Sequence, residues 1–491
     1  MAPLAAFTPP IIDFGALGPS IVLAIAAMVV LLVGVLTDDE KGRGMFAGLT
    51  IVGILAGIVA IGIQSGNRPD PKGMIVGDGF SAFFGIVILV AAAIAVLLSI
   101  SYLEKQSLSI SEYHALILFC CCGMLLVVSA GDLLIALLGI EILSIALYVL
   151  TGFSRTRTSS LEAAMKYFLL GAFSLAFLIY GTAFVFGVVK STGFAAIAAA
   201  LSPQATVSLI GNPLLIVGIG LILVGFAFKL SFAPFHMWTP DAYEGAPTPV
   251  TAFMSVATKV AVFAVLLRFL TFAIPSLASH WIPVLWAIAV LTMLVGNIAA
   301  VVQTSAKRLL AYSSVAQAGY ILVGTLSGDG LGQTSVMFYL LSYAFMNIGA
   351  FAVLMALGDP GESDIQVRDL NGLATRRPLL AAAMTVFMLS LAGIPLTAGF
   401  IGKLYVFTAA VTSGFTELAV IGVLTSVVAT FYYLRVIVAM YMRSAADEPM
   451  PIRISSVLGA VIVVLAIATI GLGIFPAIPL NFATAAAAAV R

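Results

Sequence analysis

The chain has 491 residues, of which 62% are hydrophobic and only 9% are charged, and its formal net charge is +1. Because average soluble proteins carry about 25% charged residues, this composition excludes a soluble globular domain. The near-zero net charge provides no basic footprint for nucleic acid. The chain is therefore predicted to be an all-α polytopic membrane protein.

Fourteen apolar runs are candidates for membrane-spanning helices, which need about 17–25 residues to cross the hydrocarbon core. In chain order they cover approximately 19–36, 45–64, 80–101, 113–130, 131–151, 160–189, 211–238, 248–272, 282–303, 308–326, 335–357, 378–411, 415–442 and 454–475. The seventh and twelfth contain Pro234 and Pro395. A proline inside a helix removes a backbone hydrogen bond and turns the preceding residue away from helical geometry, so we expect both helices to be broken.

Spans four to eight and nine to thirteen look like two copies of a five-helix unit. Each copy has its broken helix in fourth place with a lysine near the break, Lys229 in one and Lys403 in the other. Since five is odd, the second copy is predicted to insert upside down. Inverted repeats with broken helices are typical of ion and solute transporters. The predicted divisions are an N-terminal three-helix segment (1–112), the first repeat (113–273), the inverted second repeat (274–442) and a C-terminal helix with a tail (443–491).

The distribution of Lys and Arg predicts the orientation. With the N-terminus outside, twelve basic residues fall in inner loops and four on the outer side, as the positive-inside rule requires. The inner set is Lys41, Arg43, Lys105, Arg155, Arg157, Lys307, Arg308, Arg368, Arg376, Arg377, Arg443 and Arg453, and the outer set is Arg68, Lys72, Lys190 and Arg491. Six more lie within apolar segments: Lys166, Lys229, Lys259, Arg268, Lys403 and Arg435. Of these, Arg268 and Arg435 are near segment ends and are expected to reach lipid headgroups.

Glu141 lies near the centre of the fifth span, roughly 16 Å from its inner end at 1.5 Å per residue. Lys166 lies about two turns into the sixth span from the same side, so the two side chains meet if these helices pack. One interpretation is a structural ion pair that tolerates burial. The other is an adjustable pair, in which approach of Lys166 favours the ionised carboxylate and separation favours the protonated one. Because an ionisable residue inside a membrane is costly to bury, it is first interpreted as functional. This favours the adjustable pair.

Lys229 precedes the Pro234 break, where unwound backbone and water are expected neighbours. Burial disfavours the charged form of a lysine, so a proton can bind and leave near neutral pH. The alternative is a lysine that reaches the inner interface, but its span continues about nine residues further inward. Lys259 and Lys403 are deeper still. With Glu141 these lysines form a predicted row of titratable groups, which suggests a proton relay and not a single binding pocket.

Polar residues extend the candidate site. His236 follows the break and is a candidate for the inner mouth of an access path, although a lone histidine is more often structural. The tenth and eleventh spans carry polar side chains that either join helices or hydrogen-bond a water chain between Lys259 and Lys403. These are Tyr312, Ser313, Ser314, Gln317, Tyr343 and Asn347. Asp241 and Glu244, in an inner loop, are expected to pair with nearby basic residues.

The run FKLSFAPFHMWTPDAYEGAPTPVTAFMSVATK, with GIEILSIALYVLTG, AAMKYFLLGAFSLAFLIYG and PLTAGFIGKLYVF, resembles the antiporter-like membrane subunits of bacterial proton-translocating NADH–quinone oxidoreductase (respiratory complex I). The resemblance covers nearly the whole chain and is nearest to the N-type subunits, which are similar to mitochondrial subunit two. M-type subunits carry an acidic residue where this chain has Lys403, and Lys166 and Lys259 argue against the L-type. The resemblance implies a proton-translocating subunit with Glu141, Lys229, Lys259 and Lys403 as protonatable residues.

The resemblance further implies an obligate hetero-oligomer of the bacterial inner membrane, in contact with other membrane-arm subunits and lipids. The orientation predicted from Lys and Arg places both termini on the periplasmic side. No GxGxxG motif is suitably placed and the only cysteines, Cys120, Cys121 and Cys122, are adjacent, so no metal or redox cofactor is expected in this chain. NADH, FMN, iron–sulfur clusters and quinone are implied in partner subunits. Two alternatives stay open: a subunit of a multi-subunit sodium/proton antiporter, which should have carboxylates near the breaks, and a scaffold subunit that does not pump.

Overall fold

A computed structural model describes residues 14–37, 39–65, 73–106, 110–202, 209–328, 330–357, 365–445, 452 and 454–489, and for residues 39–43, 65 and 104–106 it describes the backbone alone. Several basic side chains that support the predicted orientation lie outside this description: Lys41, Arg43, Arg68, Lys72, Lys105, Arg453 and Arg491.

The described part of the chain forms helices, with only isolated bridges between extended residues. The α-helices are α1 (Phe14–Leu36), α2 (Asp39–Ser65), α3 (Gly79–Gln106), α4 (Ile110–Val128), α5 (Leu133–Thr151), α6 (Thr158–Val189), α7 (Phe194–Ala200), α8 (Pro213–Lys229), α9 (Trp238–Gly245), α10 (Thr248–Arg268), α11 (Ala278–Val301), α12 (Ala306–Leu326), α13 (Gly330–Ala356), α14 (Leu373–Arg376), α15 (Pro378–Ala392), α16 (Ala398–Thr412), α17 (Thr416–Met442), α18 (Ser456–Ile474) and α19 (Ala477–Ala487). A π-helix, Phe269–Ala273, continues α10, and short 3-10 helices cover Pro275–Leu277 and Val367–Leu370.

Twelve helices of the described residues are long and apolar enough to cross a membrane. With the two interrupted segments, α8 followed by α9 and α15 followed by α16, they match the fourteen predicted spans. The short helices α7 and α19, of 7 and 11 residues, were not predicted because neither has the length that crosses a bilayer. The prediction of an all-α, multi-pass membrane protein is confirmed.

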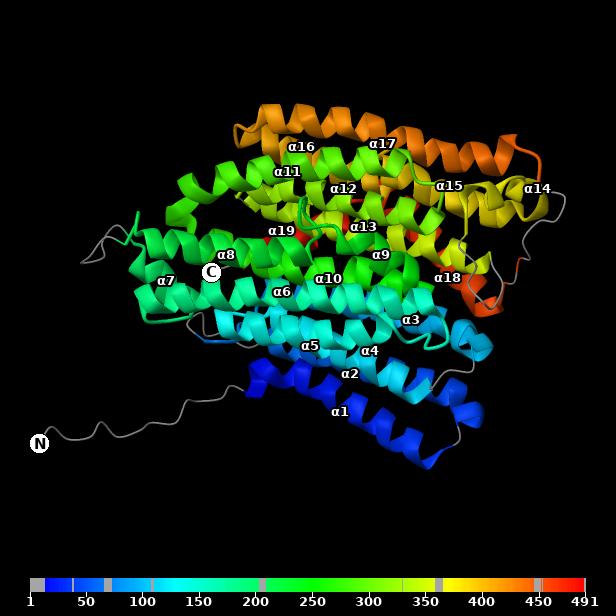
Figure 1. Ribbon diagram of the computed structural model, residues 1–491, viewed down its shortest axis with the longest axis horizontal. Helices are drawn as coiled ribbons and strands as arrows, with labels where there is room; N and C mark the ends of the chain where they lie inside the picture. Colours follow the sequence, from blue (N-terminus) through cyan, green and yellow to red (C-terminus); the bar gives the residue numbers. More distant parts are fainter. Residues whose placement is uncertain are drawn as a thin grey trace, which may run out of the picture.

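The two five-helix copies share a local feature that hydropathy does not reveal. In the first, Asp132 before α5 forms an isolated antiparallel bridge with Gly193, after α6; in the second, Ser305 before α12 pairs in the same way with Gln366, after α13. In both copies the paired residues are 61 positions apart (132 to 193 and 305 to 366). The first bridge lies at the end of the bundle that carries α7 and the second at the end that carries α14 (Figure 1). The repeats are therefore inverted, as predicted.

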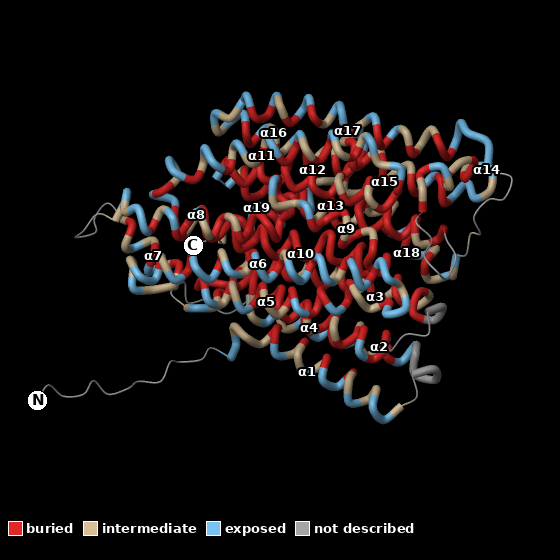
Figure 2. The backbone as a smooth tube through the Cα atoms, in the orientation of Figure 1, coloured by how far each residue is buried: buried red, intermediate tan, exposed pale blue. Residues whose placement is uncertain are grey.

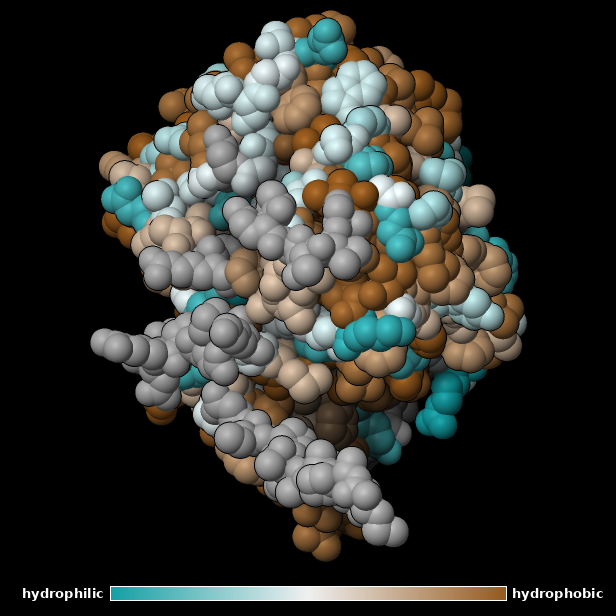
Figure 3. Space-filling view, turned by 90° about the vertical axis from the view of Figure 1, so that its left-hand side faces the viewer, coloured by the Kyte–Doolittle hydropathy of each residue, from teal (hydrophilic) through white to brown (hydrophobic). Residues whose placement is uncertain are grey.

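The centre of the bundle is formed by α10, α12 and α13. Every residue of α10 is buried, and Figure 2 shows that buried positions dominate these three helices whereas α1 and α17 alternate with exposed ones. Leu32 of α1 and Val427 of α17 are 65% and 66% exposed. Such side chains can face lipid without a solvation cost. At the end that carries α7, hydrophilic residues are scattered among apolar ones (Figure 3).

Both helices that were predicted to break do break. α8 ends at Lys229, five residues before its proline, and Ser231 follows with a φ of 62°. The predicted span 211–238 is thus helical only as far as Lys229 before the chain turns into α9. α15 ends at Ala392, and Gly393 adopts a φ of 84°. Helix ends leave carbonyl groups without intrahelical partners, so both breaks provide hydrogen-bond acceptors inside the bundle.

Arg268 does not reach lipid headgroups, so that prediction is wrong. Its side chain is 1% exposed, and Nη2 donates to Oδ1 of Asp78 at 2.8 Å, with the ring of Phe80 5.0 Å away. Arg435 donates to the carbonyl oxygen of Val301 at 2.8 Å. A charge within the membrane is costly without a partner, so Arg268 turns inward to a carboxylate, whereas the half-buried Arg435 is held by backbone carbonyls at the end of α11.

Candidate functional site

Lys229, the last residue of α8, is the first of the three lysines of the predicted row, all of which are buried. Its Nζ donates to Oγ of Ser144 at 2.7 Å and to the hydroxyl oxygen of Tyr148 at 3.3 Å, both on α5. The ring of Tyr167 lies 5.9 Å from Nζ, within reach of a cation–π attraction. Only 3% of Lys229 is exposed. The neighbours of its buried ammonium group are therefore hydroxyl groups and aromatic faces.

Glu141 lies on α5 three residues before Ser144, so the two share a helix face. The carboxylate is half-buried and interacts electrostatically with Lys229. None of the ion pairs formed among the described residues includes Glu141. Glu141 and Lys229 thus interact electrostatically and do not form a direct ion pair.

Lys166 does not serve as the counter-ion of Glu141. Its Nζ binds Glu162 at 2.7 Å and Asp241 at 2.9 Å, and its side chain is 45% exposed. Lys166 lies on the exposed face of α6. Glu162 is one turn away on the same helix, at i−4, and Asp241 of α9 is adjacent. The sequence signal for this arrangement was the Glu–Lys pair at i,i+4, which stabilises an exposed helix face.

Asp241 is the centre of an ionic cluster that includes Glu244. Its Oδ2 accepts from Lys166 at 2.9 Å and its Oδ1 from Arg308 at 2.8 Å, and Arg308 also binds Glu244 at 2.8 Å. Partial burial acts to raise the pKa of the Asp241 carboxyl, but the hydrogen bonds from Lys166 and Arg308 outweigh it and hold that pKa below its ordinary value. The expected pairing of both acidic residues is confirmed, and it ties α9 to α6 and α12.

Lys259 occupies the middle of α10 and is 1% exposed. Its Nζ donates to the carbonyl oxygen of Ser314 at 2.9 Å and also to the Ser314 hydroxyl. That hydroxyl accepts a further hydrogen bond from Tyr343 at 2.8 Å. The rings of Tyr343 and Tyr243 each lie 5.9 Å from Nζ. No described carboxylate pairs with this ammonium group, so its neighbours are uncharged.

Aromatic rings fill the space between Lys229 and Lys259. Tyr167 stacks on Trp238 with ring centroids 4.4 Å apart, and Trp238 meets Tyr243 edge-on at 6.1 Å. Tyr167 and Tyr243 also face the first and second lysine, respectively. The two lysines are therefore joined by aromatic contacts that begin in α6 and pass through α9.

Lys403 of α16 is held by the end of α15. Its Nζ donates to the carbonyl oxygens of Leu391 and Ala392 at 3.1 and 3.0 Å and to Oγ of Ser426 at 2.7 Å. These carbonyls are free to accept because the helix stops at Ala392. The ring of Tyr320 lies 4.7 Å from Nζ. The break in α15 thus creates the binding site for the ammonium group.

Gln317 connects this site to α12. Its Nε2 donates at 3.1 Å to the carbonyl oxygen of Leu391, which also accepts from Lys403, and at 3.1 Å to the hydroxyl of Tyr433. Its Oε1 accepts from the hydroxyl of Tyr339. One side chain therefore links a helix end, two tyrosines and, through a shared acceptor, the lysine.

Adjacent serines complete a polar path along α12. Ser314 binds Lys259, and the hydroxyls of Ser313 and Tyr433 are hydrogen-bonded at 2.5 Å. The path runs through Lys259, Ser314, Ser313, Tyr433, Gln317, the Leu391 carbonyl and Lys403. Among the described residues, every step is a hydrogen bond except the one between the two consecutive serines. A second chain reaches Lys403 from α11, where Asn297 accepts from Tyr432 and donates to Tyr320, both at 3.0 Å.

The remaining predicted residues lie at the margin of this path. Asn347 donates to Ser255 at 2.7 Å, one turn from Lys259 on α10. Tyr312 is not part of the path: it lies on another face of α12, with its ring 6.4 Å from that of His236. His236 is half-buried in the α8–α9 connection, and its Nδ1 is buried without a hydrogen-bond partner.

Sequence reasoning missed most of the hydroxyl groups around the lysines. These are Ser144, Tyr148, Tyr167, Tyr243, Tyr320, Tyr339, Ser426, Tyr432 and Tyr433. The signal that could have found them is the tyrosines placed inside otherwise apolar segments. A buried tyrosine hydroxyl needs a hydrogen-bond partner, and in a membrane that partner is normally another helix.

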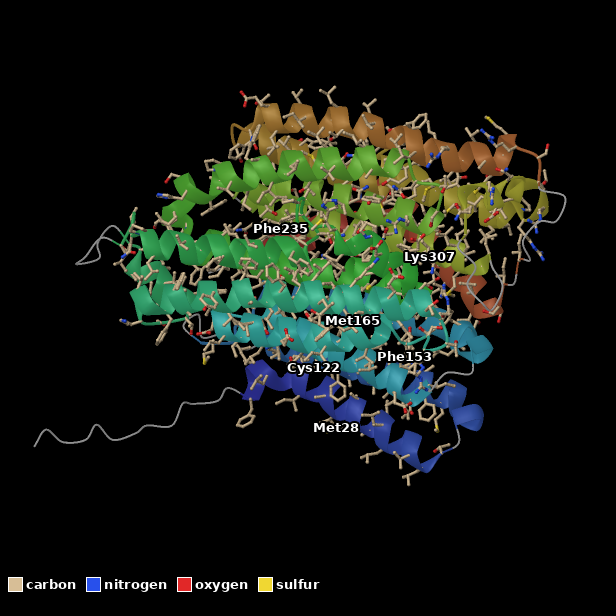
Figure 4. The ribbon with its side chains drawn as sticks, viewed as in Figure 1. Met28, Cys122, Phe153, Met165, Phe235 and Lys307 are labelled. Atoms are coloured by element: carbon tan, nitrogen blue, oxygen red, sulfur yellow. The ribbon has the colours of Figure 1, made fainter. Side chains whose placement is uncertain are left out.

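A cavity of about 390 Å³ opens beside Tyr148 at the α14 end of the bundle. It is lined by Glu112, Phe153 and Arg155 among others. Phe153 and Lys307 both lie toward this end in Figure 4. Because the Tyr148 hydroxyl also binds Lys229, the cavity reaches to within one side chain of the first lysine.

The described residues contain no group of three His, Cys, Asp or Glu side chains arranged to hold a metal ion. Cys120, Cys121 and Cys122 are buried free thiols on α4.

Comparison with known proteins matches residues 130–429 to the family described as NADH:quinone oxidoreductase/Mrp antiporter membrane subunits. The chain is 47% identical over 473 residues to NADH-quinone oxidoreductase subunit N of Trichlorobacter lovleyi, covering 96% of each chain. Among solved structures, a chain of respiratory complex I from Thermus thermophilus, solved with bound aureothin, superposes with a TM-score of 0.80 at 34% identity and covers 95% of this chain and 99% of that one. A chain of the Mrp complex from a Dietzia species, at 21% identity and a TM-score of 0.82 over 97% of both chains, has the same fold.

Proposed function

The chain belongs to the family of antiporter-like membrane subunits typified by subunit N of NADH–quinone oxidoreductase, and on that premise we propose that it relays protons through Glu141, Lys229, Lys259 and Lys403. As a member of this family it is a membrane-arm subunit of a hetero-oligomeric enzyme, respiratory complex I. The redox steps, with NADH, FMN, iron–sulfur clusters and quinone, take place in partner subunits. The relay is driven by quinone reduction elsewhere in the complex.

The observation that carries the proposal is the hydrogen-bonded path between Lys259 and Lys403. The ammonium groups of Lys229, Lys259 and Lys403 are buried in the bundle without a direct carboxylate partner among the described residues. An unpaired buried charge is costly, and these sites offset part of that cost with hydroxyl, carbonyl and aromatic neighbours. Burial opposes the charged form of each lysine and these neighbours favour it, so we infer that each can release and rebind a proton, as a relay requires.

Electrostatic switching couples the energy released by quinone reduction to the movement of protons. Transfer of one proton against 100 mV requires about 2.3 kcal/mol, and a change of about 1.4 kcal/mol in an interaction alters proton affinity tenfold. A change in the protonation of Glu141 acts on Lys229 across Ser144, and the change then passes to Lys259 and Lys403. Large helix movements are not needed.

Protons enter from the cavity beside Tyr148. Its lining by Glu112 and Arg155 makes the mouth polar, and the Tyr148 hydroxyl can pass a proton directly to Lys229. His236, in the break between α8 and α9, is a second candidate for access, because its Nδ1 is buried without a partner.

The α14 end of the bundle faces the cytoplasm in this proposal, and both termini lie on the periplasmic side of a bacterial inner membrane. Support comes from the basic residues that gather at that end, including Arg155, Lys307 and Arg308, because cytoplasmic loops are enriched in Lys and Arg. The division into 1–112, 113–273, 274–442 and 443–491 is supported by the matching bridges of the two repeats.

The alternative of a sodium/proton antiporter receives no support at the breaks. A sodium site needs oxygen ligands with negative charge, whereas both breaks hold a lysine. If the chain were a scaffold subunit that does not pump, the lysines could be replaced without loss of proton pumping by the complex.

Substitution of the central lysine tests the proposal. In Lys259→Ala, proton pumping by the assembled complex in sealed vesicles should fall at least tenfold, together with coupled quinone reduction, whereas Lys190→Ala, at the exposed end of α6, should behave as wild type. Normal pumping by an assembled Lys259→Ala complex would refute the relay.

A further inference from the structure

A cavity of about 380 Å³ lies at the α14 end, between the end of α11 and the last turns of α17. Its lining includes Arg368, Arg435 and Arg443, with Gln303, Thr304 and Asn371. Its volume is within the roughly 300–1,000 Å³ of sites that bind small ligands. The cavity is outside the polar path between Lys259 and Lys403 and has no part in the proposed relay.

The lining is positively charged and contains no acidic residue among those described. The three guanidinium groups form no ion pair with any described carboxylate. Arg435 donates to the carbonyl oxygens of Val301 and Gln303 at 2.8 and 2.5 Å, which fixes the guanidinium at the wall of the cavity. The cavity thus offers N–H donors and positive charge to an anion.

Guanidinium groups bind phosphate oxygens with charge-assisted, often paired hydrogen bonds. Three of them around one cavity suit a phosphate group better than a carboxylate, because phosphate has more acceptor oxygens. The amide of Asn371 and the hydroxyl of Thr304 add polar groups for a glycerol or second headgroup moiety.

The surroundings distinguish a lipid from a free anion. On the same two helices, within two turns of the cavity, the exposed apolar residues Ile298, Val302 and Phe431 are 62%, 71% and 60% accessible. Ile298 and Val302 are one turn apart and share a helix face, and α11 packs against α17, so exposed apolar side chains lie on both helices that border the cavity. Phosphate-binding charge beside a surface for acyl chains matches the chemistry of a phospholipid.

We propose that this cavity binds the headgroup of an anionic phospholipid, with its acyl chains on α11 and α17. Basic pockets between membrane helices at the cytoplasmic side are known to hold anionic headgroups. The bound lipid seals the junction between the start of the second repeat, α11, and its last helix, α17.

The test uses the complete complex in mild detergent, stripped of exchangeable lipid and then titrated with phosphatidylglycerol or phosphatidylcholine. Bound lipid is counted by mass spectrometry. Arg368 and Arg443 are exposed at the rim, so the double variant R368Q/R443Q should fold, and R377Q, an exposed arginine at the same end but outside the lining, is the matched control.

Each basic residue near an anionic lipid contributes a factor of about five to binding, so the double variant should bind phosphatidylglycerol roughly 30-fold more weakly. Wild type and R377Q should retain it, and phosphatidylcholine should not compete. Three outcomes would overturn the proposal: equal binding of both lipids, unchanged binding in the double variant, or complete displacement of phosphatidylglycerol by millimolar inorganic phosphate, which would indicate a free-anion site. None of these outcomes bears on proton pumping, so they are separate from the test of the relay.

Discussion

Gly171 of α6 lies so close to the hydroxyl group of Tyr148 on α5 that a Cβ atom at this glycine would overlap it. The same hydroxyl accepts from Lys229 at 3.3 Å. The absence of a side chain at position 171 is therefore what lets Tyr148 stand between the cavity and the first lysine. This contact depends on how α5 packs against α6, which no local sequence motif determines.

Gly171→Ala should displace the Tyr148 ring and weaken its hydrogen bond to Lys229. Since a hydrogen bond to a charged group contributes about 1.5–3 kcal/mol, we expect the pumping rate in reconstituted vesicles to fall about tenfold or more. Gly187→Ala is the matched control on the same helix, because a Cβ there meets nothing within 4 Å. Equal pumping by the two variants would show that the position of Tyr148 does not matter.

A second glycine positions the third lysine. Gly393 has a φ of 84°, and a Cβ at this residue would lie 2.8 Å from Cδ of Lys403. Gly393→Ala should therefore strain the break and also push Lys403 off the Leu391 carbonyl. Gly414→Ala carries the backbone strain alone, since Gly414 has a φ of 85° and open space around its Cβ position.

Both variants should lose about 1–3 kcal/mol of stability from the left-handed backbone, seen as similar decreases in thermal inactivation temperature. Only Gly393→Ala should lower the number of protons pumped per NADH oxidised. If the two variants pump alike after correction for assembled complex, the contact with Lys403 has no role in transfer.

Hydropathy and the positions of prolines were enough to predict the spans, the two breaks and the burial of Lys229, Lys259 and Lys403, because each depends on residues that are near one another in the chain. Lys229 and Lys403 stand out against apolar neighbours, and Pro234 and Pro395 cannot continue a helix. Helix ends were less well predicted. α8 stops at Lys229 because the backbone turns at Ser231, for which the sequence gives no signal.

The partners of the charges could not be predicted. In a membrane, lipid-facing and core-facing sides of a helix are equally apolar, so the sequence does not say which face Lys166 occupies. Its real partners depend on the packing of α6 against α9. Likewise Arg268 pairs with Asp78, 190 residues away, a contact that only the packing of α10 against α3 creates.

The ionic cluster of Asp241 makes a prediction about stability and pH. Asp241→Asn removes the charge that holds Lys166 and Arg308, and because these partly exposed pairs contribute about 0.2–1 kcal/mol each, a small decrease in thermal stability is expected with pumping retained. Because the pKa of Asp241 is lowered in the folded chain, its contribution is complete above the unfolded value near 3.9 and is lost only as the pH falls through the lower, folded value.

Thermal inactivation of wild type and Asp241→Asn should therefore differ by a constant amount from pH 6 to pH 8, and the difference should shrink only below about pH 4. A difference that disappears between pH 6 and pH 8 would mean that another group accounts for it.

Gln317 provides the most direct test of the proposed proton path, because its side chain joins Tyr433 to the carbonyl group that binds Lys403. The measurement is the ratio of protons translocated to NADH oxidised by the assembled complex in sealed vesicles, for Gln317→Leu and for Gln333→Leu, a buried glutamine of α13 that lies outside the path. A lower ratio in Gln317→Leu with a normal ratio in Gln333→Leu is the expected result. A normal ratio in Gln317→Leu, with the complex intact, would contradict proton transfer between Lys259 and Lys403.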